Sequence, residues 1–113
     1  MIKKINIGII VIMFFIFSVN YSAFAQKLYI ISGSNYVGCT NKKYYEKLVN
    51  YAVQNDLVAF KKALTIGILT GMCTIFKYGE KVYITDVSIF SGLIKVRRPG
   101  EIIEYWTVPE AVK

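Results

Sequence analysis

Basic and aromatic residues cluster near the C-terminal end of the sequence, in the stretch GLIKVRRPGEIIEYWTV at positions 92–108. Together with a tyrosine just upstream, they are Tyr83, Lys95, Arg97, Arg98, Tyr105 and Trp106. Cations and aromatic rings side by side on a small barrel can hold anionic or extended ligands, including single-stranded nucleic acids. The residue types therefore indicate a binding surface, provided that the fold brings them to one face.

Catalytic chemistry has little support in the sequence. The chain has no histidine, so a Ser-His or Cys-His nucleophile pair cannot form. The stretch GSNYVG at 33–38 is followed by Cys-Thr instead of the Lys-Ser/Thr of a phosphate-binding loop. Asp86, Glu101 and Glu104 are the acids expected on or beside the sheet, and so small a domain has little room for an acid/base cleft. We predict a protein that is not an enzyme and needs no cofactor.

The first 25 residues have the three regions of an export signal in order. Lys3 and Lys4 precede an apolar run from Ile7 to Phe17, and the segment ends in the small-x-small pattern Ala23-Phe24-Ala25. An uncleaved anchor is the alternative, but a spanning helix needs about 20 apolar residues. No cysteine follows Ala25, which argues against a lipoprotein. We predict cleavage after Ala25, no stable membrane insertion afterwards, and a periplasmic or secreted protein.

Cleavage would leave a single domain, residues 26–113, and would lower the net charge from +7 to +5 by removing two lysines. This domain contains two cysteines, Cys39 and Cys73, and thiols pair in an oxidising compartment. Free thiols or a redox pair are alternatives, although redox pairs normally have Cys-x-x-Cys spacing. We predict a structural disulfide and no metal site, because two cysteines without histidine are too few ligands for zinc.

The N-terminal half of the domain is predicted to be mainly helical. An apolar burst at 28–31 indicates a short strand or extended arm, and residues 40–66 have the spacing of a helical hairpin. Thr40 or Asn41 can cap the first helix, Asp56 can cap the second, and Gly67 is the expected stop. The second helix is similar to part of an ankyrin repeat, but one copy cannot form a solenoid. Export and the short second helix disfavour a DNA-binding helix-turn-helix.

The C-terminal half has the alternation of β-strands. Turns are expected at Gly79, at Ser91-Gly92 and at Pro99-Gly100, where the pair is typical of a type II turn with flanking charges in solvent. The last strand, expected at 102–108, leads to a single 3₁₀ turn at Pro109. Short strands at regular spacing suggest a small barrel. The predicted fold is therefore α+β: a helical hairpin followed by an antiparallel barrel at 72–112.

This strand-rich segment resembles the bacterial SH3-like barrel. The resemblance rests on Gly-Glu-Lys-Val at 79–82, Gly-Leu-Ile-Lys-Val-Arg at 92–97, Gly100, Tyr105-Trp106 and Pro-Glu-Ala-Val at 109–112. It departs from the family in lacking the acidic-aromatic stretch that precedes the usual peptide groove, and in having a helical hairpin before the barrel. As a whole, the chain is similar to small exported bacterial proteins of unknown role that join a helical segment to such a barrel.

The functional expectation is a non-catalytic binding protein of the bacterial envelope. Adjacent antiparallel strands bring same-face residues together, so Tyr83, Lys95 and Arg97, with Tyr105 or Trp106 beside them, would contact an envelope protein, a peptide or peptidoglycan. Whether Trp106 points into the core or outward beside Arg97 stays open.

Three other functions compete with this expectation. Nucleic-acid binding is disfavoured, because export removes the protein from nucleic acid and three cations are a weak electrostatic footprint. An inhibitor or immunity protein against an envelope-acting enzyme or toxin is the main alternative, with the helical hairpin as a possible contact. A small hydrolase has the least support.

Overall fold

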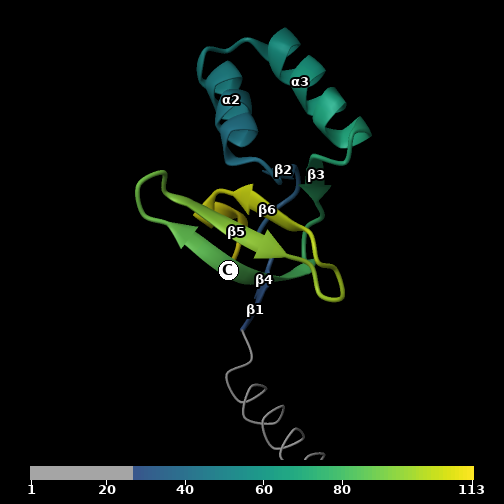
Figure 1. Ribbon diagram of the computed structural model, residues 1–113, viewed down its shortest axis with the longest axis vertical. Helices are drawn as coiled ribbons and strands as arrows, with labels where there is room; N and C mark the ends of the chain where they lie inside the picture. The colour runs from purple at the N-terminus through teal and green to yellow at the C-terminus, as the bar shows by residue number, and fades with distance from the viewer. Residues whose placement is uncertain (1–26) are drawn as a thin grey trace, which may run out of the picture.

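The computed structural model describes residues 27–113, so the predicted signal peptide at 1–25 lies outside the described residues. The fold is α+β, with a strongly curled antiparallel sheet and a helical hairpin that projects from it (Figure 1). The strands are β1 (Leu28–Ile30), β2 (Tyr36–Cys39), β3 (Cys73–Phe76), β4 (Lys81–Ser88), β5 (Leu93–Arg97) and β6 (Glu104–Thr107). The helices are α2 (Lys42–Val53), α3 (Leu57–Leu69) and the 3₁₀ turn η1 (Pro109–Ala111).

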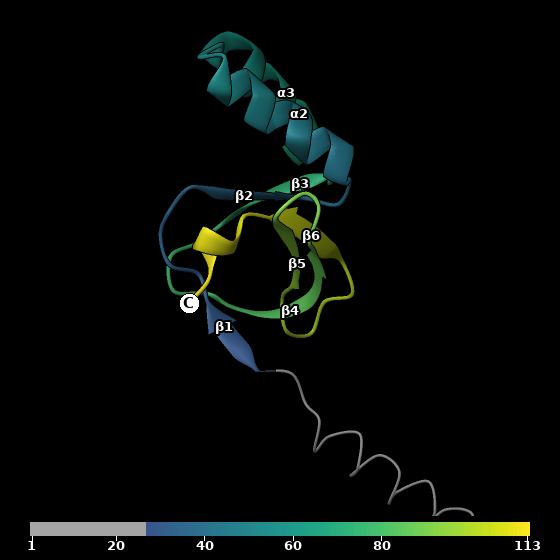
Figure 2. The ribbon, with the colours of Figure 1, turned by 90° about the vertical axis from the view of Figure 1, so that its left-hand side faces the viewer.

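The six strands form one sheet in the order β1-β4-β5-β6-β2-β3, and Figure 2 shows how far it curls. Within residues 27–113 the sheet is not closed, because β1 and β3 are its two end strands and do not pair with each other. The predicted order, a helical hairpin followed by the sheet, holds for β3 to β6 alone. β1 and β2 precede the hairpin, which is therefore an insertion between the paired strands β2 and β3.

The main core lies inside the curl of the sheet. Successive side chains of a strand point to opposite faces, so one set from each strand points inward. The buried residues of this core are Ile31, Phe76, Val82, Ile94, Val96 and Tyr105. The rings of Phe76 and Tyr105 meet edge to face at 6.0 Å between centroids. A Cβ at position 38 would lie 2.6 Å from Phe76 Cε2. Position 38 therefore requires glycine, because the backbone of β2 passes directly over the Phe76 ring and the Cβ of Tyr105.

The helical hairpin begins and turns where the sequence predicts. The side chain of Asn41 accepts a hydrogen bond from the Tyr44 N–H (2.9 Å), and that of Asp56 accepts one from the Ala59 N–H (3.1 Å). Each cap satisfies a backbone donor that the first turn of a helix leaves free. Both capping predictions are confirmed. The predicted 3₁₀ turn is also present, as η1.

A second core joins the hairpin to the sheet. Its buried residues are Cys39, Tyr45, Leu48, Ala63, Cys73 and Leu93. The disulfide between Cys39 and Cys73 lies within it, as predicted, and links the paired ends of β2 and β3 at the base of the hairpin. The bridge therefore closes a loop that contains both helices.

Gly67 does not stop the second helix, so that prediction is wrong. α3 continues to Leu69, and the chain leaves the helix through Thr70 and Gly71, whose φ is +76°. Gly67 is buried inside the helix, where an added Cβ would lie 2.6 Å from Cys73 Sγ and 3.0 Å from Cys73 Cβ. The glycine is needed because α3 packs directly against the disulfide.

Substitution of Gly67 by alanine is expected to destabilise the protein by up to about 2 kcal/mol. Alanine favours a helix over glycine by about 1 kcal/mol, but overpacking a core costs about 1–3 kcal/mol and the disulfide cannot move aside cheaply. Urea unfolding of the oxidised protein measures the difference. In a Cys39→Ala/Cys73→Ala background the sulfur atom is absent. The loss of unfolding free energy caused by Gly67→Ala should therefore be smaller by about half or more. An equal cost in both backgrounds would contradict the packing explanation.

Candidate binding surface

Four of the predicted site residues lie on one face of the sheet. In the strand register Tyr83 is opposite Arg97, and Lys95 is opposite Trp106. Tyr83 follows the inward-facing Val82, and Lys95 and Arg97 flank the inward-facing Val96. Because successive side chains of a strand point to opposite faces, these residues and the cross-strand partner Trp106 point away from the main core. All four are partly exposed. We call Tyr83, Lys95, Arg97 and Trp106 the basic-aromatic face.

Tyr105 is not part of this face. It pairs with Val96, is only 6% exposed and packs edge to face on Phe76 inside the curl. Adjacent residues of a strand point to opposite sides, so Tyr105 and Trp106 cannot both face a ligand on one surface. The predicted contact residue Tyr105 is therefore a core residue.

Trp106 points outward, toward the base of the helical hairpin. It packs against the second core, while the Lys95 ammonium lies 4.7 Å and the Lys42 ammonium 5.4 Å from the centre of its ring. Trp106 is therefore not beneath Val82 and Val96. Lys42 was missed by the sequence analysis, because nothing in the local pattern brings the first residue of α2 to the end of β6.

The cations of the basic-aromatic face are held against aromatic rings. The guanidinium carbon of Arg97 lies 4.9 Å from the Tyr83 ring centre, and Arg97 also donates a hydrogen bond to the Glu101 carbonyl oxygen (3.0 Å). Lys95 lies 3.8 Å from a carboxylate oxygen of Glu104. This ion pair is partly exposed and contributes little stability. The register also places Asp86 opposite Lys95 and Glu104 opposite Arg97, so the face carries charges of both signs. Among the described residues, Arg97 is the cation of this face that forms no ion pair with a carboxylate, which makes it the group best suited to bind an anion.

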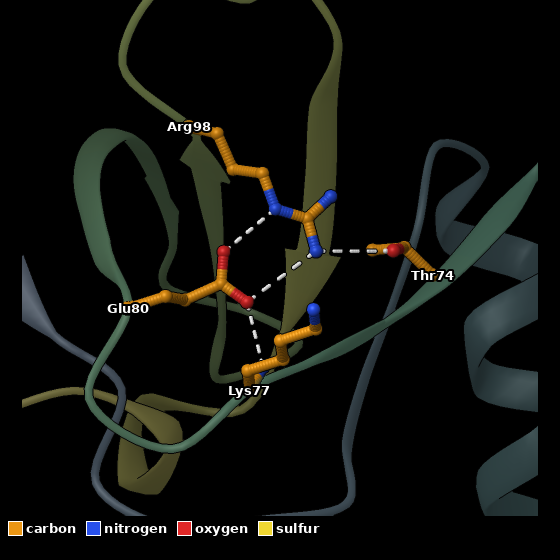
Figure 3. Close-up of polar contacts among 4 residues, drawn as sticks. All are labelled: Thr74, Lys77, Glu80 and Arg98. Carbon is orange, nitrogen blue, oxygen red and sulfur yellow. Dashed lines mark hydrogen bonds and ion pairs between the residues drawn. The ribbon is translucent and has the colours of Figure 1, made fainter.

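Arg98 has a different role from its neighbour Arg97, and the prediction that both flank a turn in solvent is wrong for Arg98. Figure 3 shows its guanidinium between Glu80 and Thr74. Nε donates to Glu80 Oε1 at 2.7 Å, and Nη2 donates to Thr74 Oγ1 at 3.1 Å. The Lys77 N–H donates to Glu80 Oε2 at 2.6 Å. The guanidinium thus connects the turn after β5 to β3 and to the turn before β4.

Arg98 also covers one part of the main core. Its guanidinium carbon lies 5.0 Å from the Phe76 ring centre and 5.6 Å from that of Tyr105. The turn that positions it was predicted correctly: Glu101 N–H donates to the Arg98 carbonyl, and Gly100 has φ +81°. The ion pair itself was missed, because Glu80 and Arg98 are far apart in the sequence.

The electrostatics of this cluster favour the charged forms of both partners. Partial burial would raise the pKa of Glu80, but the hydrogen bonds from Arg98 and from the Lys77 N–H outweigh burial and lower the pKa. For Arg98, burial would lower the pKa, and the hydrogen bond and charge of Glu80 raise it instead. We interpret this pair as structural, because it links turns and strands.

Two grooves follow helix α2, away from the basic-aromatic face. One, of about 390 Å³, lies between α2, the turn after β4 and η1, and the other, of about 370 Å³, lies between the hairpin and β2. Both are lined by Tyr45 and Val49, and burial raises the pKa of the Tyr45 hydroxyl. Within residues 27–113, no three His, Cys, Asp or Glu side chains gather as a metal site would require.

No helix in the described part of the chain has the length and apolar character needed to cross a membrane. Comparisons with protein-family models, with curated proteins and with solved structures find no match.

Proposed function

We propose that the protein is an exported, non-catalytic binding protein of the bacterial envelope, and that the basic-aromatic face is its contact surface. The observation that supports this most strongly is that residues of three neighbouring strands present two cations and two aromatic rings on one side of the sheet. The ligand class that fits is extended and anionic: a carboxylate-bearing peptide segment of an envelope protein, or the peptide stem of peptidoglycan.

Arg97 is the best-placed group for such a ligand. Guanidinium binds carboxylate through paired hydrogen bonds, and arginine has five N–H donors. Among the described residues, Arg97 uses its side chain for one acceptor, the Glu101 carbonyl. Its stacking on Tyr83 restricts the side chain before a ligand arrives, which lowers the entropy lost on binding.

We further propose that the curled sheet is an SH3-like barrel with the helical hairpin inserted between two of its strands. The succession of β4, β5 and β6 through short turns supports this assignment, as does the return of Val112 to pair with Ile31. In this arrangement the basic-aromatic face is on the outside of the barrel, beside the inserted hairpin.

The double variant Lys95→Glu/Arg97→Glu is expected to weaken binding about tenfold or more. Reversing both charges removes hydrogen bonds to a charged partner and adds repulsion, and tenfold corresponds to only about 1.4 kcal/mol. Co-sedimentation with purified peptidoglycan sacculi, and crosslinking pull-down from native envelopes, cover the two ligand sources.

Lys43→Glu/Lys47→Glu is the matched control, because it makes the same change in charge on exposed positions of α2. The control should retain binding in whichever assay detects it. Equal losses in both variants would mean that general charge attraction explains the binding. If the face variant kept its fold and all of its binding, the proposal would be refuted.

A further inference from the structure

Helix α3 is apolar on nearly every side, although only one of its sides is packed. In its sequence LVAFKKALTIGIL, only two lysines, a threonine and a glycine interrupt the apolar residues. The side around Ala63 and Gly67 is buried against α2 and the disulfide. The exposed apolar residues of α3 are Leu57 (56% exposed), Val58 (65%), Ile66 (56%), Ile68 (41%) and Leu69 (80%). A helix that is apolar all round is normally covered on all sides.

The uncovered apolar residues lie on the part of α3 that is not packed against α2 and the disulfide, with Leu57 and Val58 in its first turn and Ile66, Ile68 and Leu69 near its end. Lys61, Lys62 and Thr65 lie between these two groups. At about 100° per residue, Val58, Thr65 and Leu69 are on the side opposite Ala63, with the two lysines flanking them. Lys61, Lys62, Thr65 and Ile66 line a shallow hollow of about 410 Å³ on this side. We call Leu57, Val58, Ile66, Ile68 and Leu69, with Lys61 and Lys62, the α3 stripe.

The charge on the α3 stripe is entirely positive. α3 contains no acidic residue, and within residues 27–113 neither Lys61 nor Lys62 forms an ion pair. A second copy packed antiparallel on this stripe would bring four lysines together near the helix centres, where their like charges would repel. A partner that is both apolar and negatively charged does not meet this obstacle.

We propose that the α3 stripe docks the protein on an anionic lipid surface. The apolar side chains would enter the boundary between headgroups and acyl chains, and Lys61 and Lys62 would extend their ammonium groups to the phosphates. The helix would lie in the interface without crossing the bilayer. The projection of the hairpin from the sheet leaves α3 accessible for this contact, and β1 lies at the opposite end of the molecule (Figures 1 and 2).

This inference concerns a different element from the basic-aromatic face and does not depend on the ligand proposed for it. The two surfaces belong to the helical hairpin and to the sheet respectively. Binding to vesicles and binding to sacculi are therefore separate measurements, and either can fail alone.

The test is flotation of the full protein, as purified from the periplasm of expressing cells, with vesicles of phosphatidylcholine alone or mixed with phosphatidylglycerol. Binding is expected only with the anionic lipid. Each lysine near an anionic surface contributes about fivefold to binding, so Lys61→Glu/Lys62→Glu should weaken it about twentyfold or more. Val58→Gln/Leu69→Gln should weaken it about tenfold, because it removes two apolar side chains from the interface.

Two matched controls make the test specific to α3. Lys43→Glu/Lys47→Glu has the same change in charge, and Ile89→Gln/Phe90→Gln removes an apolar pair that is at least as exposed, at 88% and 103%. Both should stay within about twofold of the unaltered protein. All variants have the same N-terminal segment, so differences between them report on the described domain.

Three results would overturn the proposal. The first is a loss of vesicle binding in the two control variants that equals the loss in the α3 variants. The second is binding to phosphatidylcholine vesicles that equals binding to vesicles containing phosphatidylglycerol. The third is a dimer, seen by sedimentation equilibrium, that Val58→Gln/Leu69→Gln dissociates, because the stripe would then bind a second copy. Because Val58 and Leu69 are mostly exposed, their replacement should leave the fold intact, which circular dichroism verifies.

Discussion

Replacing Cys39 and Cys73 together by alanine is expected to lower the free energy of unfolding by about 3–4 kcal/mol. The two residues are direct partners in the β2–β3 pairing and are 34 positions apart. Closing a loop of that length removes about 3.8 kcal/mol of conformational freedom from the unfolded chain in the chain-entropy model. Small domains are stable by about 5–15 kcal/mol in total. The loss would therefore be a large part of the stability.

Urea unfolding of the oxidised protein, the reduced protein and the double variant measures this effect. The reduced protein and the double variant should have similar midpoints, both well below that of the oxidised protein. Mass spectrometry of the purified protein without reductant should first show the loss of two hydrogens. Unfolding midpoints that did not depend on oxidation would show that the bridge has no stabilising role.

Replacing Arg98 by alanine is expected to cost about 2–3 kcal/mol, whereas the same change at Arg97 should cost less than about 1 kcal/mol. Hydrogen bonds to charged groups contribute about 1.5–3 kcal/mol, and the variant would leave the carboxylate of Glu80 partly buried without its partner. Within residues 27–113, the guanidinium of Arg97 instead lies over one ring and donates to one carbonyl oxygen. Arg97→Ala is thus the matched control for Arg98→Ala, because the two arginines are adjacent in the sequence. Chemical denaturation measures the free energy of unfolding of both variants.

The effect of Arg98 should also depend on pH. The pKa of Glu80 is lowered in the folded state, because its hydrogen bonds to Arg98 and to the Lys77 N–H outweigh the opposing effect of burial. A lowered folded-state pKa contributes stability above the unfolded-state value, about 4.3, and this contribution is lost as pH falls through the folded-state pKa. The stability gap between the unaltered protein and Arg98→Ala should therefore narrow below about pH 4. A constant gap down to about pH 2 would contradict this account.

The sequence predicts those parts of the fold that depend on neighbouring residues. Asn41 and Asp56 cap helices through the next turn of backbone, and Pro99-Gly100 determines its own turn. Strand alternation also places Lys95 and Arg97 on one face. In each case the interacting residues lie within about four positions of one another, so a local sequence pattern is sufficient to predict the structure.

The features that the sequence analysis missed depend on residues brought together from a distance. Gly67 resembles a helix stop, and only the position of Cys73 shows that it is a packing position. Arg98 resembles a solvated charge until Glu80 lies beside it. Whether Tyr105 or Trp106 faces the core depends on the strand register, and a shift of one residue would exchange them. A single sequence does not show which residues from distant positions come into contact.

The position of the disulfide also determines how the protein would respond to a pulling force on its two ends. Cys39 and Cys73 join the base of the inserted hairpin, so tension along the backbone would pass through the sulfur atoms and bypass both helices. The chain between the cysteines, which are 34 positions apart, could add no length while the bond is intact. After reduction, and once both helices unfold under tension, this segment could lengthen by about 110 Å, at about 3.4 Å per extended residue. The oxidised hairpin is thus mechanically isolated from the strands on either side of it.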